Sequence, residues 1–115
     1  MAAPLMTGTG IGTALQVAMV VIGHFLPLDQ QAWWFPAVGT LLGGVTGWLA
    51  APGASGTGAA AGQGAAAGGI AGVLGSLVST ALGDAPVSNA IVAGGATVVS
   101  GAIGAVIRAM RGARQ

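Results

Sequence analysis

His24 is the only histidine in this 115-residue chain, and it lies near the end of a long apolar segment, about one turn before Pro27. A neutral imidazole nitrogen can be an axial ligand to haem or chlorophyll, so a pigment- or haem-ligating role is one interpretation of His24. Light-harvesting polypeptides usually carry a small residue four positions before such a histidine, and this chain has Val20 there. We therefore expect the plainer role, an interfacial histidine that bonds a carbonyl group, Asp29 or water. A histidine-linked proton switch is the third interpretation.

Asp29 and Asp84 are the only acidic residues, and each lies in a turn between two apolar segments. Turn formation and solvation explain both, and a pair that binds a cation or a partner's basic residue is the alternative. The chain contains no cysteine, no glycine-rich phosphate loop before a lysine and no Ser-His-Asp arrangement. These absences predict a protein that is not an enzyme. They also predict no resident metal or cofactor, apart from the haem or pigment alternative at His24.

Gln16 and Gln63 are polar side chains inside apolar segments. An amide without a hydrogen-bond partner costs several kcal/mol in hydrocarbon, so each should face another helix. Contact with a ligand is the alternative for both, and for Gln63 a place at the membrane interface is a further one.

The composition indicates that lipid surrounds most of this chain. Hydrophobic residues make up 54% of the sequence, and only 4% of the residues are charged. Soluble domains carry about 25% charged residues, so this chain has too little polar surface to cover a core in water. The net positive charge comes from three arginines. They form no basic face and are not interleaved with aromatic residues, which excludes a nucleic-acid partner.

Four uncharged segments are each long enough to cross a bilayer as a helix, which takes roughly 20 residues. They cover residues 10–27, 33–50, 60–82 and 88–110, with a glycine-rich linker over residues 51–59. Their apolar residues do not alternate as barrel strands require. The predicted fold is therefore an all-α membrane protein, one domain over residues 1–115 with four transmembrane helices in an antiparallel bundle.

Two of these segments have an alternative interpretation. The third is mostly alanine and glycine before Ile70, so it is either a full span or a half-span that begins near Gly68 after a long loop. The first resembles the apolar region of a signal peptide. We expect it to be a retained span, because no Lys or Arg precedes Arg108.

Small residues recur every four positions in three of the segments, and residues four apart share one helix face. Such ladders let two helix backbones approach closely in lipid, where no hydrophobic drive joins helices. They either fold the monomer tightly or dock it against another protein. The predicted helix-packing glycines are Gly39, Gly43, Gly47, Gly64, Gly68, Gly72 and Gly101.

Arginine placement predicts the orientation, because basic residues favour the cytoplasmic side. Arg108, Arg111 and Arg114 place the C-terminus in the cytoplasm of a bacterial inner membrane, and four spans return the N-terminus to the same side. The loops with Asp29 and Asp84 then face the periplasm. Aromatic belts agree with this layout, with interface anchors at Trp33, Trp34 and Trp48.

The sequence favours a non-catalytic accessory subunit that docks through its small-residue faces in a larger integral membrane complex of photosynthetic or respiratory type. Its partners would be membrane lipids and other integral membrane subunits. One alternative is a homo-oligomeric, holin-like pore or small channel lined by Ser76, Ser79, Thr80, Thr97 and Ser100. The other is a pigment- or lipid-binding membrane protein centred on His24. Ion-coupled transport is poorly supported, because no predicted span contains a carboxylate.

Overall fold

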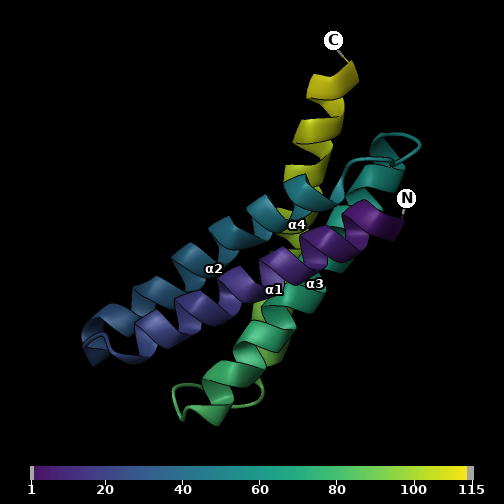
Figure 1. The fold of residues 1–115 in the computed structure, drawn as a ribbon. Helices are drawn as coiled ribbons and strands as arrows, with labels where there is room; N and C mark the ends of the chain where they lie inside the picture. Colours follow the sequence, from purple (N-terminus) through teal and green to yellow (C-terminus); the bar gives the residue numbers. More distant parts are fainter. Residues whose placement is uncertain (1, 114–115) are drawn as a thin grey trace.

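The computed structural model describes residues 2–113, and this part of the chain forms four α-helices without any strand (Figure 1). The helices are α1 (Ala2–His24), α2 (Leu28–Ala50), α3 (Thr57–Ala81) and α4 (Asn89–Ala113). The prediction of an all-helical chain is confirmed.

Helices α1, α2 and α3 begin before the predicted spans, whereas α4 begins one residue after its predicted start and continues to Ala113. Helix α1 ends at His24, before the predicted end at residue 27. Helix α1 includes Pro4, because a proline in the first helical turn removes no intrahelical hydrogen bond. Helix α2 begins at Leu28 and continues through Pro36. Helix α3 is continuous from Thr57, so the half-span interpretation is wrong, and the linker shortens to residues 51–56. Alanine offsets the weak helix propensity of glycine along this segment.

Three of the helices are long and apolar enough to cross a membrane, over Ala3–His24, Thr57–Ala81 and Asn89–Gly112. Helix α2 has a similar length, but its first turns contain Asp29, Gln30 and Gln31 and it carries three tryptophans. These residues lower its hydropathy below that of the other three helices. Its membrane crossing therefore stays a prediction.

The four helices form two hairpins, α1–α2 and α3–α4. Helices α1 and α4 each pack against both α2 and α3, which also contact each other. Figure 1 shows the two hairpin turns at one end of the molecule and both described chain ends, with the α2–α3 loop, at the other. The long dimension of 45 Å is close to the thickness of a bilayer with its headgroups, about 40–45 Å.

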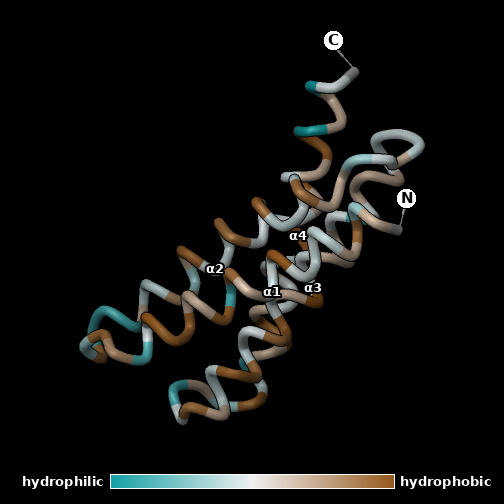
Figure 2. The backbone as a smooth tube through the Cα atoms, in the orientation of Figure 1, coloured by the Kyte–Doolittle hydropathy of each residue, from teal (hydrophilic) through white to brown (hydrophobic). Residues whose placement is uncertain are grey.

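Small residues lie inside the bundle and large apolar residues lie outside. Ala60, Ala67, Ala71 and Ala105 are fully buried, whereas many large aliphatic and aromatic side chains are exposed. Figure 2 shows that strongly hydrophilic residues concentrate at the two ends of the molecule. An apolar outer surface with few charges is suited to lipid contact, and a core of alanine and glycine brings the backbones close together.

Candidate functional site

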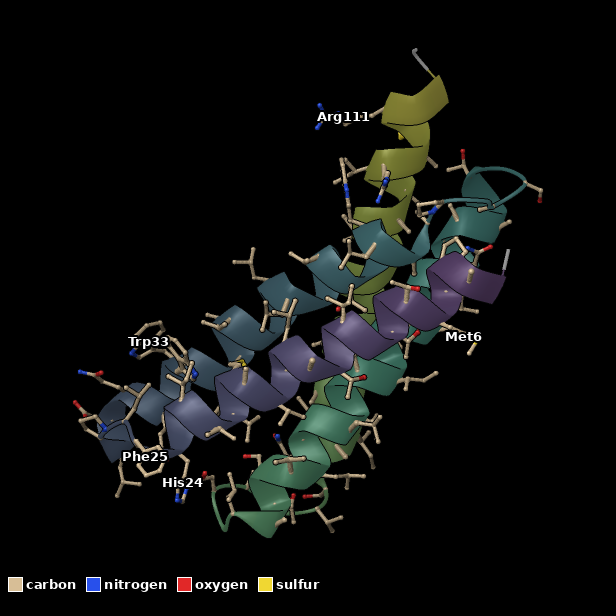
Figure 3. All side chains as sticks on the ribbon, in the orientation of Figure 1. Met6, His24, Phe25, Trp33 and Arg111 are labelled. Carbon is tan, nitrogen blue, oxygen red and sulfur yellow. The ribbon has the colours of Figure 1, made fainter. Side chains whose placement is uncertain are left out.

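His24 and Asp84 join the two hairpins at the turn end of the bundle. His24 Nδ1 lies 2.8 Å from Asp84 Oδ2, and Figure 3 shows the imidazole beside the α3–α4 turn. The Asp84 side chain is 10% exposed and that of His24 is 35% exposed. The hydrogen-bond partner of His24 is therefore Asp84, which lies 60 residues away, and not the expected Asp29, which is exposed in the first turn of α2.

The end of α3 fixes the position of Asp84. Gly83 has a positive φ of 83°, which glycine adopts without strain. The Asp84 amide donates to the Ser79 carbonyl (3.0 Å) and the Gly83 amide donates to the Thr80 carbonyl (3.0 Å). This pattern is a Schellman motif, the common helix end that is closed by a left-handed glycine. It turns the chain so that Asp84 faces His24.

A cleft of about 430 Å³ separates the two hairpins next to this contact. Its size is in the range of small-molecule sites, about 300–1,000 Å³. All four helices and the α3–α4 turn contribute to it. The lining residues are Gln16, Met19, Val20, Leu28, Gln31, Ala32, Phe35, Pro36, Gly39, Thr40, Gly72, Ser76, Ser79, Asp84, Ala85, Pro86, Asn89, Val92, Ala93, Ala96 and Thr97.

The inner wall of the cleft carries buried polar side chains from the middle of the helices. Gln16 is 3% exposed and its amide Nε2 donates to the Gly39 carbonyl (2.9 Å). Thr97 is also 3% exposed and its hydroxyl donates to the Ala93 carbonyl (2.8 Å). Each of these bonds satisfies one polar group without closing the cleft. The expectation that Gln16 faces another helix is confirmed.

Ser79 is the unsatisfied polar group of the cleft. Its side chain is 3% exposed, and its hydroxyl has no hydrogen-bond partner among the described residues. One helical turn earlier on the same helix, the Ser76 hydroxyl accepts a hydrogen bond from Asn89 Nδ2 (3.2 Å). A buried hydroxyl without a partner costs about 1–3 kcal/mol, so Ser79 is a polar group beside the cleft that is left without a hydrogen bond.

The exposed residues that line the cleft lie on α2, on α4 and at Pro86 of the α3–α4 turn. Leu28, Ala32, Pro36 and Thr40 line it from one face of α2 at four-residue intervals, and all four are exposed. Val92 borders it from α4 and is 70% exposed. The opening is thus largely apolar and the inner wall is polar, an arrangement that accepts a molecule with an apolar body and a hydrogen-bonding group.

The seven predicted packing glycines are all buried inside the chain. Gly39 faces Gln16 and Met19, and Gly43 faces Thr97 and Ser100. A Cβ atom at Gly47, Gly64 or Gly68 would contact the backbone of α4, and one at Gly72 would contact the Thr97 side chain. Gly101 lies where α4 meets both α2 and α3. These positions therefore face other helices of the same chain.

The three tryptophans predicted to be interface anchors lie towards the two opposite ends of the bundle. Trp33 is 55% exposed near the hairpin turns, and Trp34 Nε1 donates to the Met19 carbonyl (3.0 Å). Trp48 lies at the other end, against Arg108 and Arg111. Arg114 falls outside the described residues.

Sequence reasoning missed two features of the packing. Gly8 and Gly12 form a fourth ladder, whose added Cβ atoms would contact Ala50 and Thr46 of α2. The four-residue spacing of these glycines was visible in the sequence, but Gly8 precedes the predicted span. The His24–Asp84 contact had no signal in the sequence, because it depends on how the two hairpins cross.

Gln63 lies near the opposite end of the bundle from the cleft, and its Nε2 donates to the Ala50 carbonyl (2.7 Å). It thus joins α3 to the end of α2, as expected of a polar side chain that faces another helix.

Four of the five residues expected to line a pore do not form an outward polar stripe. Ser76, Ser79 and Thr97 are buried and line the cleft within one chain, and Ser100 faces Gly43. A pore between copies of this chain would need another lining.

No protein-family model matches this chain, and no curated protein or solved structure is significantly similar to it. The geometry of the bundle is therefore the basis of the functional argument.

Proposed function

We propose that this protein is a non-catalytic membrane protein that holds an amphipathic, lipid-like molecule in the cleft between its two hairpins. The observation that carries the proposal is the cleft itself, which has an apolar opening and a polar inner wall. In this proposal all four helices cross the membrane, α2 included, and the glycine ladders hold the hairpins together.

The burial pattern supports a membrane-spanning bundle of this kind. Leu41 of α2 is 71% exposed, and Ile91 of α4 is 80% exposed. In water such side chains would cost about 25 cal/mol for each Å² of apolar surface, whereas lipid removes that cost. Close backbone contacts at Gly47 and Gly101 replace the missing hydrophobic drive between helices.

The cleft supports a bound molecule with one polar group. The exposed faces of α2 and α4 offer the molecule's apolar body an entrance from the hydrocarbon. Ser79 supplies an unused hydroxyl on the inner wall, and Asp84 borders the same space at the turn end. A hydroxyl or carbonyl on the ligand would satisfy Ser79. The ligand is thus a neutral amphiphile with an apolar chain or ring system.

The test is to identify molecules that copurify with the protein and to ask whether they occupy the cleft. The protein is extracted in a mild detergent, and organic extracts are compared by mass spectrometry between wild type, Ala32→Trp and Ala37→Trp. Both alanines are exposed on α2, but only Ala32 lines the cleft. The indole at position 32 should displace the ligand, whereas the one at position 37 should leave it in place. Equal recovery from both variants would contradict the proposal.

Docking in a larger membrane complex is a second proposal, and one observation favours it. Gly58 and Gly62 of α3 face open space, and Ala66 continues the same exposed face one turn further. This face, rather than the buried ladders, would then receive another integral membrane subunit. Native electrophoresis after gentle extraction distinguishes docking on other subunits from self-association. Comigration with other chains supports docking, and exclusive self-association supports a homo-oligomer.

The orientation and location remain part of the proposal. The arginine-rich end faces the cytoplasm of a bacterial inner membrane, and the hairpin-turn end, with Asp29 at the start of α2 and Asp84 in the α3–α4 turn, faces the periplasm. The support is the position of Arg108 and Arg111 at the end opposite both acids, which follows the charge bias of membrane proteins.

A further inference from the structure

A second cavity lies at the arginine end of the bundle, opposite the cleft. It has a volume of about 550 Å³ and is formed by the end of α2, the α2–α3 loop and the last turns of α4. Its lining residues are Trp48, Ala51, Pro52, Gly53, Ala54, Ser55, Gly56, Thr57, Arg108, Ala109, Arg111 and Gly112.

Two arginines converge on one tryptophan at the edge of this cavity. The guanidinium carbons of Arg108 and Arg111 lie 5.4 Å and 5.6 Å from the centroid of the Trp48 ring. Arg108 Nη1 also donates to the Trp48 carbonyl (2.8 Å). The aromatic ring and this carbonyl hold the Arg108 guanidinium group in place. Its other N–H groups are left to bind a ligand.

No carboxylate side chain neutralises this pair. The only acidic residues of the chain are Asp29 and Asp84, and both lie at the hairpin-turn end. Two like charges held close together repel each other, and an anion between them removes the repulsion. Guanidinium groups bind phosphate through paired, charge-assisted hydrogen bonds.

The backbone around the cavity adds hydrogen-bond donors with a partial positive charge. Helix α3 begins at Thr57. Its N-cap residue is Gly56, which has no side chain to accept a hydrogen bond from the first N–H groups of the helix. The first N–H groups of a helix have no partner within the helix and carry a partial positive charge. Ser55 and Thr57 border the same space and bring hydroxyl groups. The arginine pair defines the site, and these groups complement it.

We propose that this cavity binds a phosphate group, supplied by the headgroup of an anionic phospholipid. The cavity lies at the end of the apolar helices, where a bilayer has its headgroups. Basic pockets between helices at this level are suited to lipid phosphates. Trp48 is suited to the same interface. This site is independent of the cleft, because the two share no lining residue.

The experiment reconstitutes the full chain into nanodiscs of phosphatidylcholine with a minor share of phosphatidylglycerol and counts retained lipids by native mass spectrometry. The variants are Arg111→Gln, Arg111→Lys and the double variant Arg108→Gln with Arg111→Gln. Circular dichroism checks that each variant is helical. Because Arg111 is exposed and makes no hydrogen bond within the described residues, Arg111→Gln tests the site even if the double variant fails to fold.

Wild type should retain phosphatidylglycerol over phosphatidylcholine. Arg111→Gln should lower this retention about tenfold, and Arg111→Lys should recover only part of it, since an ammonium lacks the planar fork. Ala32→Trp should retain phosphatidylglycerol normally, which separates this site from the cleft. Equal retention of both lipids by wild type, or unchanged retention in Arg111→Gln, would overturn the proposal. Inorganic phosphate is the second probe. Displacement of the lipid by millimolar phosphate would overturn the lipid source and assign the site to a free anion.

Discussion

Gly47 and Gly101 touch where α2 crosses α4, so closely that a methyl group on Gly47 would overlap the carbonyl oxygen of Gly101. A methyl group on Gly101 would in turn contact Gly64 of α3. This crossing joins three helices without any side chain between them. The space for the cleft follows from it, because α2 and α4 diverge from this point towards the hairpin turns.

The crossing predicts that Gly101→Ala destabilises the bundle. The added methyl group would meet the Gly64 carbonyl and lie 3.2 Å from the Gly68 Cα, so the α3 backbone must move. We expect a loss of about 1–3 kcal/mol in unfolding free energy, as for other overpacked cores. Reversible unfolding in detergent micelles measures this loss.

Gly95→Ala on the same helix is the matched control, because nothing lies within 4 Å of a Cβ atom there. It should keep or slightly raise the stability, since alanine favours a helix by about 1 kcal/mol over glycine. Equal stability of the two variants would show that α4 does not pack through Gly101.

The His24–Asp84 contact predicts a measurable coupling between the hairpins. His24→Ala, Asp84→Ala and the double variant form a thermodynamic cycle that isolates the pair. We expect a coupling of about 1 kcal/mol, because the His24 side chain is 35% exposed and water screens the pair. Unfolding free energies of the four proteins give this value. Asp29→Asn should change stability little, as its exposed side chain has no partner among the described residues. If the losses of unfolding free energy in the two single variants add up to the loss in the double variant, the two hairpin turns are not joined by this pair.

The sequence predicted the elements of this fold better than their arrangement. Absence of charge marked four segments that are helical in the structure. The first turn lies at residues 25–27, ahead of the predicted residues 28–32, because Pro27 precedes α2 and does not end α1. The start of α3 was placed three residues late, because the glycine-rich stretch after Gly56 resembles a loop. Gly43 and Gly68, two of the glycines predicted from the spacing of small residues, are buried.

The site could not be predicted in the same way. The cleft combines residues from α1 and α4, such as Gln16 and Thr97, that are 81 positions apart. Their proximity depends on the angle at which two hairpins cross, and helix periodicity contains no information on that angle. The same holds for Asp84, whose type suggested only a solvated turn.

Alanine substitutions at two buried serines can distinguish a residue that binds the ligand from one that only packs inside the bundle. Ser79 and Ser100 both have buried hydroxyl oxygens without hydrogen-bond partners in the described part of the chain, but only Ser79 lines the cleft. Each serine-to-alanine change should leave stability unchanged or raise it by about 1 kcal/mol in the ligand-free protein, since an unsatisfied hydroxyl is removed. Only Ser79→Ala should lower the amount of copurified amphiphile. Equal amounts from both variants would place the bound molecule elsewhere.

The position of α2 in the membrane can be tested because the chain contains no cysteine. Gln30 lies in the first turn of α2 and Ser55 lies in the loop after it, and both are exposed. A membrane-impermeant maleimide reports which single cysteine at these two positions faces the outside of intact cells. We expect labelling at position 30 and protection at position 55, since the arginine end faces the cytoplasm in our proposal. Ser88→Cys, at the other hairpin turn, should label like position 30. If positions 30 and 55 label alike, α2 does not cross, and the cleft would then open towards water instead of lipid.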